Sequence, residues 1–143
     1  MKTSQKGIDL IKSFESLELK AYRCPAGVLT VGYGHTGSDV KNDTTITKEK
    51  AEELLRKDMT DAEMVVNRIQ GLNQNQYDAL VSFVYNCGSG NFDKSTLKRL
   101  VISNPRDPKI REAFGMWIKA SGKPMAGLVR RREAESNLYF SKS

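Results

Sequence analysis

The chain has 143 residues, a mass of 16.0 kDa and a formal charge of +6, and its 38% hydrophobic and 28% charged residues form an ordinary globular mixture. Its two cysteines and one histidine are too few for a disulfide framework or a typical zinc site, which argues against zinc fingers and metallohydrolases. No apolar run exceeds three residues, and the first twelve residues lack the apolar core of a signal peptide, so the sequence predicts neither a membrane span nor a leader.

The N-terminal third predicts a helix, a hairpin and a second, longer helix. Apolar residues at helical spacing predict a first helix that ends near Glu15. β-branched and aromatic residues around a Pro-Ala-Gly centre predict a β-hairpin over 21–35, and 36–46 is expected to be a loop or a third short strand. Thr47 is the expected N-cap of a helix that continues to about residue 70. Because about 23 helical residues span roughly 34 Å, we expect this helix to connect two lobes.

The remainder of the chain predicts helices only. Asn73 is the expected N-cap of a helix that runs to Asn86, and Asp107 that of another. The predicted helices after the connecting helix cover residues 74–86, 95–103, 108–120 and 127–140. The pattern therefore predicts a small lobe with a hairpin, a long helix and a helical lobe, and binding clefts favour such junctions.

Glu15 and the predicted hairpin carry the first candidates for chemistry. Glu15 follows Phe14 at the end of an apolar helix, a setting that suits a general acid, although an ordinary exposed glutamate is the alternative. Thr30 shares one strand face with Gly32 and Gly34, which leaves room for a ligand against the backbone. Glycines that only permit turns or bulges are the alternative interpretation.

Glu15, Cys24 and Thr30 also form a spaced triad. Eight residues separate the first two, five separate the next two, and Thr30 runs into a Gly-x-Gly-His turn. This segment resembles the active-site segment of the phage-type lysozymes, the endolysin muramidases, which carry Glu, then Asp or Cys, then Thr at these spacings. Three later segments are also similar, and the resemblance extends over about residues 7–140; the three segments are 76–83, 86–92 and 127–135.

The resemblance implies an α+β, two-lobe lysozyme-like fold in a single domain over 1–143. Its small N-terminal β-hairpin lobe would cover about 14–46, the connecting helix 47–70, and a larger all-helical C-terminal lobe 71–143. The N-terminal helix would pack on the helical lobe. The substrate cleft would lie between the two lobes.

The activity implied by the resemblance is hydrolysis of the β-1,4 bond between N-acetylmuramic acid and N-acetylglucosamine in peptidoglycan. Glu15 would protonate the leaving oxygen, while Cys24 and Thr30 would hold or activate the attacking water. The usual second carboxylate is replaced by a thiol, which has an ordinary pKa near 8.5 and could be partly ionised beside Arg23. Inverting attack by water and retaining attack by the thiolate both stay open. By position in the family motifs, four residues are expected to contact substrate: Thr36, Tyr85, Ser95 and Arg111.

Several residues have a structural and a functional interpretation. His35 could pair with Cys24 as in cysteine hydrolases, but its place in the family turn favours a structural role, anchored to Asp58 or Asp61. Cys87 is expected to be a small buried hydrophobe, although a disulfide with Cys24 stays open. The run 130–132 is either a solvated arginine face or a contact for acidic groups of the envelope.

The positive charge is concentrated at the C-terminal end. Residues 94–143 hold 12 basic and 4 acidic residues, whereas 1–93 hold 11 and 13, so an anionic partner or mere solubility would explain the excess. Nucleic acid is not the expected partner, because no aromatics interleave with the charges and the triad would be idle. Two further functions stay open: a cysteine-dependent cell-wall amidase or peptidase, and a lysozyme-fold binding protein with little activity.

The expected partners are peptidoglycan glycan strands and a membrane-permeabilising holin, with no cofactor and no metal. The chain is expected to be a monomer that accumulates in the host cytoplasm until release to the cell wall.

Overall fold

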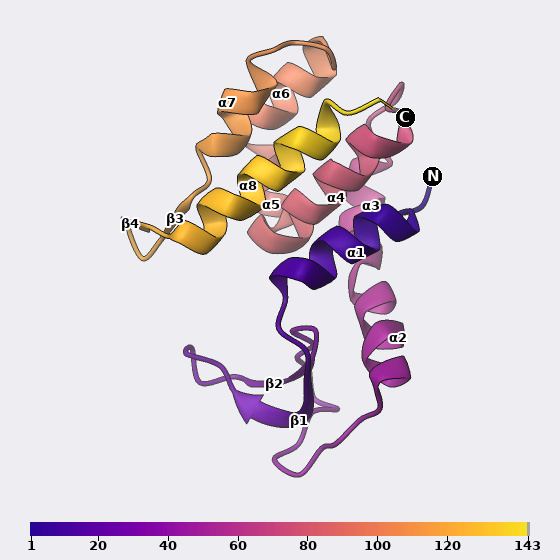
Figure 1. Cartoon of the computed structure of the whole chain (residues 1–143), viewed down its shortest axis with the longest axis vertical. Helices are drawn as coiled ribbons and strands as arrows, with labels where there is room; N and C mark the ends of the chain where they lie inside the picture. The colour runs from indigo at the N-terminus through magenta and orange to yellow at the C-terminus, as the bar shows by residue number, and fades with distance from the viewer. Residues whose placement is uncertain (143) are drawn as a thin grey trace. The chain divides into compact units, whose positions relative to one another are not determined.

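The structure is a computed structural model, and it describes residues 1–142. The elements, in chain order (Figure 1), are α1 (Gln5–Phe14), β1 (Glu18–Arg23), β2 (Leu29–Gly32), α2 (Lys48–Asp58), α3 (Thr60–Val66), α4 (Gln74–Cys87), α5 (Ser89–Asp93), α6 (Thr96–Ser103), α7 (Ile110–Gly115), β3 (Lys119–Ala120), β4 (Lys123–Pro124) and α8 (Ala126–Tyr139). The chain divides into two compact units, which we call the hairpin unit (Ile11–Thr60) and the helical unit (Met1–Leu10 with Asp61–Ser143).

The hairpin unit contains the predicted β-hairpin. Strands β1 and β2 are antiparallel, with Tyr22 opposite Thr30 and Arg23 opposite Leu29. The turn is closed by two backbone hydrogen bonds, from the Cys24 amide to the Val28 carbonyl at 3.0 Å and from the Gly27 amide to the Cys24 carbonyl at 2.8 Å. Gly27 has a φ of +82°, which L side chains rarely adopt, so the glycine of the Pro-Ala-Gly centre meets a backbone requirement. The expected third strand is reduced to an isolated bridge from Lys20 to Thr45.

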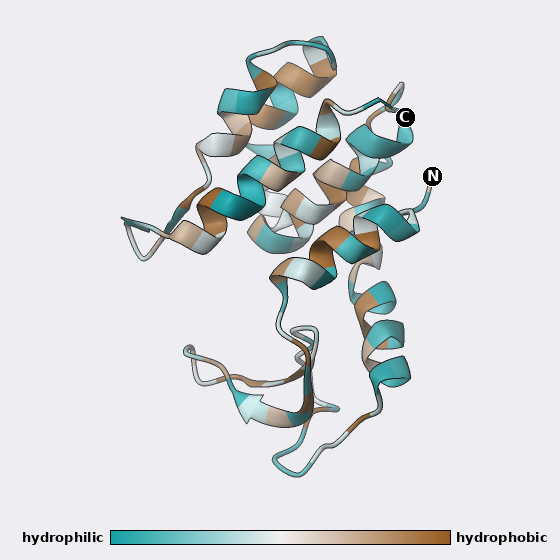
Figure 2. Ribbon diagram, in the orientation of Figure 1, coloured by the Kyte–Doolittle hydropathy of each residue, from teal (hydrophilic) through white to brown (hydrophobic). Residues whose placement is uncertain are grey.

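Helix α2 begins at the predicted N-cap. The Thr47 side chain accepts a hydrogen bond from the Lys50 amide at 3.1 Å. Ala51 and Leu55 are buried, whereas hydrophilic residues predominate along the rest of α2 (Figure 2). This one-sided burial follows the apolar stripe in the sequence and explains why the segment folds as an amphipathic helix.

The prediction of one helix over 47–70 is wrong in its length. The segment forms two helices, α2 and α3, with Met59 between them, and α3 ends at Val66. The Thr60 hydroxyl lies 3.5 Å from the Arg56 carbonyl, the acceptor that the Thr60 amide would use in an uninterrupted helix. Such a side-chain contact competes with the backbone hydrogen bonds of the helix for the same carbonyl group. It is therefore a local reason for the interruption of the helix.

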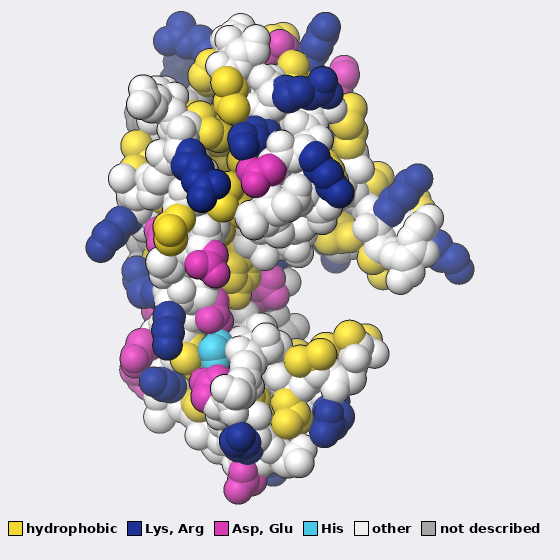
Figure 3. Space-filling view, turned by 180° about the vertical axis from the view of Figure 1, so that it is seen from behind, with side chains coloured by type: hydrophobic (Ala, Val, Ile, Leu, Met, Phe, Trp, Pro, Cys, Tyr) yellow, Lys and Arg dark blue, Asp and Glu magenta, His cyan; other side chains and the backbone are white. Residues whose placement is uncertain are grey.

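His35 ties the segment after β2 to the end of α2. Its Nδ1 lies 2.8 Å from Asp58 Oδ2, and its Nε2 lies 3.0 Å from Asp39 Oδ2. Burial disfavours the charged ring, but the hydrogen bonds to the two carboxylates outweigh it and raise the pKa of His35 above its ordinary value. Figure 3 shows this single histidine beside acidic side chains. The predicted structural anchor to Asp58 is confirmed.

In the helical unit, α4 and α8 pack along each other (Figure 1). Helix α4 begins with a capping box, in which the Gln76 amide donates to Asn73 Oδ1 at 2.8 Å and the Asn73 amide donates to Gln76 Oε1 at 3.0 Å. Phe83 of α4 meets Phe92, Phe114 and Trp117 edge to face, with ring centroids 5.8–6.0 Å apart. The predicted helices around these rings are therefore joined by one aromatic core.

The helical unit is not entirely helical. The helix predicted over 108–120 ends at Gly115, and the short strands β3 and β4 follow it. Their turn contains Ser121 and Gly122, with φ of +51° and +77°. Ser-Gly is a turn signal that the helical periodicity obscured. Helix α5 was likewise not predicted.

Two of the three consecutive arginines of α8 are buried, so a solvated face over 130–132, one of the two interpretations of this run, holds for Arg130 alone. Arg131 is 3% exposed, Arg132 is 1% exposed, and Glu135 beside them is fully buried. The Nε atoms of the two arginines lie 3.3 Å and 2.7 Å from Glu135 carboxylate oxygens. Arg132 also donates to Cys87 Sγ and to Asn86 Oδ1, both at 2.7 Å. Two buried guanidinium groups therefore share one buried carboxylate inside the packing of α4 against α8.

The hydrogen bonds of His35 with Asp58 and Asp39 are here called the His35 clamp. We expect this clamp to make the free energy of unfolding depend on pH. A group whose pKa is raised on folding contributes its full stabilisation of the folded state at pH values below its pKa in the unfolded chain, which is about 6.5 for histidine. This contribution is lost as the pH rises through the pKa of the group in the folded protein. Asp58→Asn should therefore flatten the fall in unfolding free energy between about pH 6 and pH 8. Denaturant titrations at several pH values measure this slope.

Asp43→Asn is the matched control for this measurement, because it removes an exposed carboxylate of the same unit that the clamp does not use. Equal slopes for the parent, Asp58→Asn and Asp43→Asn would contradict the clamp's contribution.

Removing the buried carboxylate of α8 should destabilise the helical unit strongly. Glu135→Gln leaves two buried guanidinium groups without their counter-charge, and breaking such a pair costs about 3–5 kcal/mol. Chemical denaturation measures the loss, with the exposed neighbour Glu133→Gln as control. A loss of less than about 1 kcal/mol, the range of an exposed ion pair, would show that the network contributes little.

Candidate functional site

Cys24 and Thr30 lie next to each other at the turn that joins β1 and β2. Cys24 directly follows β1, and Thr30 is the second residue of β2, opposite Tyr22. The Thr30 hydroxyl donates to the Val28 carbonyl at 3.0 Å and also lies within hydrogen-bonding reach of the Cys24 thiol. Thr30 is buried, whereas Cys24 is half-buried and a free thiol. The structure thus brings together two of the three residues of the spaced triad.

The backbone of the turn favours the ionised form of Cys24. Its pKa is lowered, chiefly by the amide of Val28 and then by the amide of Ala26, against a smaller opposing effect of burial. The hydroxyl of Thr30 contributes in the same direction when it donates its proton to the thiolate instead of to the Val28 carbonyl. The expected source, Arg23, instead donates to the Gly27 carbonyl at 2.8 Å. Cys24 therefore has a larger thiolate fraction near neutral pH than an ordinary cysteine.

Glu15 lies directly after α1, and its amide donates to the Ile11 carbonyl at 3.1 Å. Its carboxylate approaches the segment that follows β2, because a Cβ atom placed on Gly34 would lie 3.5 Å from Glu15 Oε2. Gly34 has a φ of +87°, so a side chain there would be strained as well as close to the carboxylate. Glu15 thus meets the chain four residues beyond Thr30.

His35 is not arranged to activate Cys24. A cysteine hydrolase needs a ring nitrogen in contact with the thiol. Both ring nitrogens of His35 are instead hydrogen-bonded to carboxylates, those of Asp58 and Asp39. Sequence reasoning did not single out Asp39, although its position four residues after His35 is a signal that could have indicated it.

Of the four predicted substrate contacts, Thr36 belongs to the hairpin unit and the other three to the helical unit. Thr36 is exposed directly after His35, and Tyr85 is half-buried near the end of α4. Arg111 is exposed on α7 and donates to Asn137 at 2.8 Å. For these residues a contact with substrate stays a prediction.

Ser95 has a structural role of its own. It is 3% exposed and is the N-cap of α6. Its hydroxyl accepts from the Lys98 amide at 3.1 Å and donates to the Phe92 carbonyl at 2.7 Å. A substrate contact by Ser95 stays a prediction beside this role.

Across residues 1–142, no group of three or more histidine, cysteine, aspartate or glutamate side chains is placed to hold a metal ion. In the same part of the chain, no helix combines the length and the apolar character needed to cross a membrane. The candidate site itself offers one carboxyl group, one thiol and one hydroxyl, all on the hairpin unit.

The chain is similar to phage lytic enzymes in sequence and in structure. The phage lysozyme family model matches residues 12–135. An endolysin of Bacillus phage PZA is 44% identical over 99% of this chain and 56% of its own length, and one of Salmonella phage P22 is 40% identical over 99% of both chains. The muramidase domain of SpmX from Asticaccaulis excentricus matches with a TM-score of 0.90 at 37% identity, over 99% of both chains.

The relatives differ in length. This chain spans 56% and 55% of the endolysins of Bacillus phages PZA and B103, but 99% of the P22 endolysin. The structural match confirms the predicted α+β, lysozyme-like fold class. Because the family model covers most of the chain and relatives above 30% identity cover nearly all of it, the chain belongs to the phage lysozyme family.

Proposed function

We propose that the chain is an endolysin that hydrolyses the β-1,4 bond between N-acetylmuramic acid and N-acetylglucosamine of bacterial peptidoglycan. Family membership supports this activity, as do the names of relatives described as endolysins and as a muramidase domain. The observation that carries the proposal is on the hairpin unit. The Glu15 carboxylate lies beside Gly34, which follows β2. Thr30 is on β2, and Cys24 lies in the turn before β2, within hydrogen-bonding reach of Thr30.

Glu15 is the proposed general acid. It donates a proton to the glycosidic oxygen as the bond between that oxygen and the anomeric carbon breaks. Gly34 keeps side-chain atoms away from Glu15 Oε2, which leaves space for the sugar oxygen at the carboxyl group. After the reaction Glu15 is a carboxylate that regains its proton from solvent.

Cys24 and Thr30 take the place of the second carboxylate. In the inverting route, the Cys24 thiolate accepts a proton from water while the water oxygen attacks the anomeric carbon, and the Thr30 hydroxyl holds the water or the thiolate. The lowered pKa of Cys24 makes this base available near neutral pH. In the retaining route, the thiolate itself attacks and water later hydrolyses the thioglycoside. The anomeric form of the first product distinguishes the two routes.

Contacts of Thr36, Tyr85, Ser95 and Arg111 with the substrate belong to the same proposal. Ser95 is also the N-cap of α6. Monomeric action, accumulation in the host cytoplasm and release by a separate membrane-permeabilising holin remain predictions. The carboxylate partners of His35 argue against a cysteine-dependent amidase, which would release free amino groups rather than reducing sugar ends.

Glu15→Gln should lower the rate of reducing-end release from purified peptidoglycan by about 100-fold or more, because an amide cannot supply the proton. The turbidity of outer-membrane-stripped cells should fall with the parent and not with this variant. Glu18→Gln, an exposed glutamate of β1, is the matched control and should retain the parent's rate. Equal rates for the parent and Glu15→Gln would contradict the assignment of the acid.

Replacing Cys24 should change both rate and pH profile. Cys24→Ala should lose at least about tenfold, since the general base is removed, whereas Cys24→Asp should keep much of the activity and shift the acid limb toward the ordinary aspartate pKa near 3.9. Iodoacetamide should inactivate the parent but not Cys24→Asp. Cys87 provides an internal comparison, because burial raises the pKa of its thiol and slows its alkylation. Full activity of Cys24→Ala would rule out the proposed role.

A further inference from the structure

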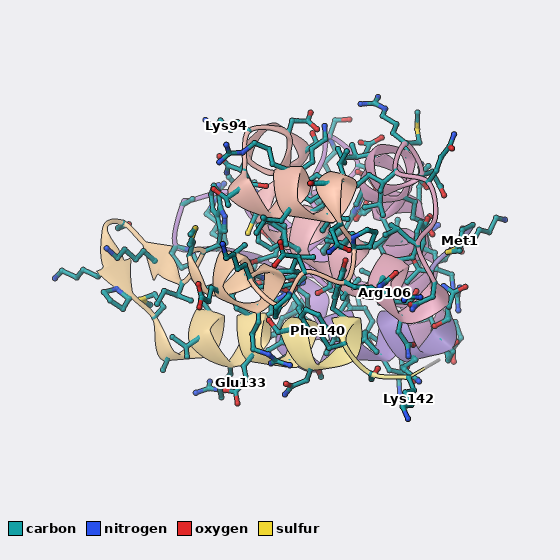
Figure 4. All side chains as sticks on the ribbon, turned by 90° about the horizontal axis from the view of Figure 1, so that it is seen from above. Met1, Lys94, Arg106, Glu133, Phe140 and Lys142 are labelled. Carbon is teal, nitrogen blue, oxygen red and sulfur yellow. The ribbon has the colours of Figure 1, made fainter. Side chains whose placement is uncertain are left out.

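One pocket of the helical unit is lined by residues that are distant in the sequence from Glu15, Cys24 and Thr30. Its volume is about 520 Å³. It is formed by the start of α4, the loop between α6 and α7, and the end of α8 with the residues after it. The lining residues are Asn73, Gln76, Pro105, Arg106, Tyr139, Phe140, Ser141 and Lys142, of which three are labelled in Figure 4.

The polar groups at the start of α4 offer donors to this pocket. In the capping box, the side-chain oxygen of each of Asn73 and Gln76 accepts a hydrogen bond from the backbone amide of the other residue. The NH₂ groups of both side chains are then the parts that remain for a ligand. A helix N-terminus adds a partial positive charge in the same place.

Two acceptors in the pocket are used by the chain itself. The Pro105 carbonyl accepts from the Tyr139 hydroxyl at 2.7 Å, which also ties the loop to α8. The Ser141 hydroxyl donates to the Leu138 carbonyl at 2.7 Å and accepts from Asn75 at 3.0 Å. These two acceptors of the lining are therefore already engaged within the chain.

Two cations complete the lining. Arg106 and Lys142 are exposed, and the eight described lining residues include no aspartate or glutamate. Another pocket of this unit, of about 390 Å³, differs because a carboxylate, that of Glu133, lines it beside Arg111 and Arg132. Arginine and lysine beside amide donors are the groups that bind phosphate and carboxylate.

We propose that the pocket at Arg106 and Lys142 binds an oxyanion, a phosphate or carboxylate group carried by a cell-wall polymer. The choice of the wall as source rests on the proposed function, whereas the recognition of an oxyanion does not. Phe140, which is 37% exposed, offers an apolar surface for the carbon atoms next to the charged group. Such a site holds the enzyme on the wall independently of the catalytic residues.

The first test uses inorganic phosphate and the full chain carrying Glu15→Gln. Sodium phosphate is titrated against sodium chloride at equal ionic strength, and backbone amide NMR signals report where it binds. We expect shifts centred on the pocket residues, and at least tenfold weaker binding after Arg106→Gln with Lys142→Gln. Lys119→Gln with Lys123→Gln is the matched control, because it removes the same charge from the exposed β3–β4 hairpin.

Phosphate shifts outside the pocket, no phosphate-specific shifts, or equal weakening by the two double variants would overturn the proposal. Unchanged unfolding midpoints verify that both double variants are folded.

The second test identifies the source of the oxyanion. The same proteins are bound to intact walls, to walls stripped of phosphodiester polymers and to walls stripped of stem peptides. On intact walls, the Arg106→Gln/Lys142→Gln variant should bind more weakly than the Lys119→Gln/Lys123→Gln variant. If the two variants bind equally to walls stripped of phosphodiester polymers, the ligand is a phosphate. If they bind equally to walls stripped of stem peptides, the ligand is a carboxylate. No difference on intact walls overturns the wall as source. Failure of the parent to release reducing ends, with phosphate binding retained, would refute the proposed function alone.

Discussion

The position of the candidate site depends on how the chain turns after β2. Two backbone hydrogen bonds, at 2.8 Å and 2.9 Å, join Val31 and His35 and close this turn. The His35 ring then connects the turn to Asp58 at the end of α2. Gly34, inside the same turn, is the point that the Glu15 carboxylate approaches. A buried, doubly bonded imidazole thus fixes the backbone on which the proposed acid depends, without taking part in the chemistry.

The thiol at position 24 changes the electrostatics that a second carboxylate would provide. An exposed carboxyl group, with an ordinary pKa near 4, is ionised at neutral pH, whereas a thiol, with an ordinary pKa near 8.5, is mostly protonated and needs help from its surroundings to ionise. Here the help comes from backbone amides of a tight turn, those of Val28 and Ala26, and not from a nearby cation. The turn geometry is therefore part of the proposed base, and substitutions that relax the turn would affect it without touching the thiol.

Much of this arrangement could be predicted from sequence, because it follows from local patterns. The hairpin places Cys24 near Thr30 through strand pairing, and the glycine-containing turn is evident from residue types. The interruption of the helix at Met59 and the burial of Arg132 could not be predicted in this way, and the Ser-Gly turn signal at Ser121 was obscured by the helical periodicity around it. The interruption depends on a side-chain contact, that of Thr60 with the Arg56 carbonyl, and the burial of Arg132 depends on partners in α4 that are distant in the sequence. The spacing of apolar residues contains neither.

The central claim is that Glu15 supplies the proton to the leaving oxygen, and activated substrates test it most directly. A muramyl substrate with a dinitrophenyl leaving group needs no proton, whereas the natural β-1,4 bond does. The account predicts that Glu15→Gln is far slower than the parent on the natural bond but close to it in bond cleavage of the activated substrate. An equal loss on both substrates would contradict the account, because it would assign Glu15 to binding or folding rather than to proton transfer.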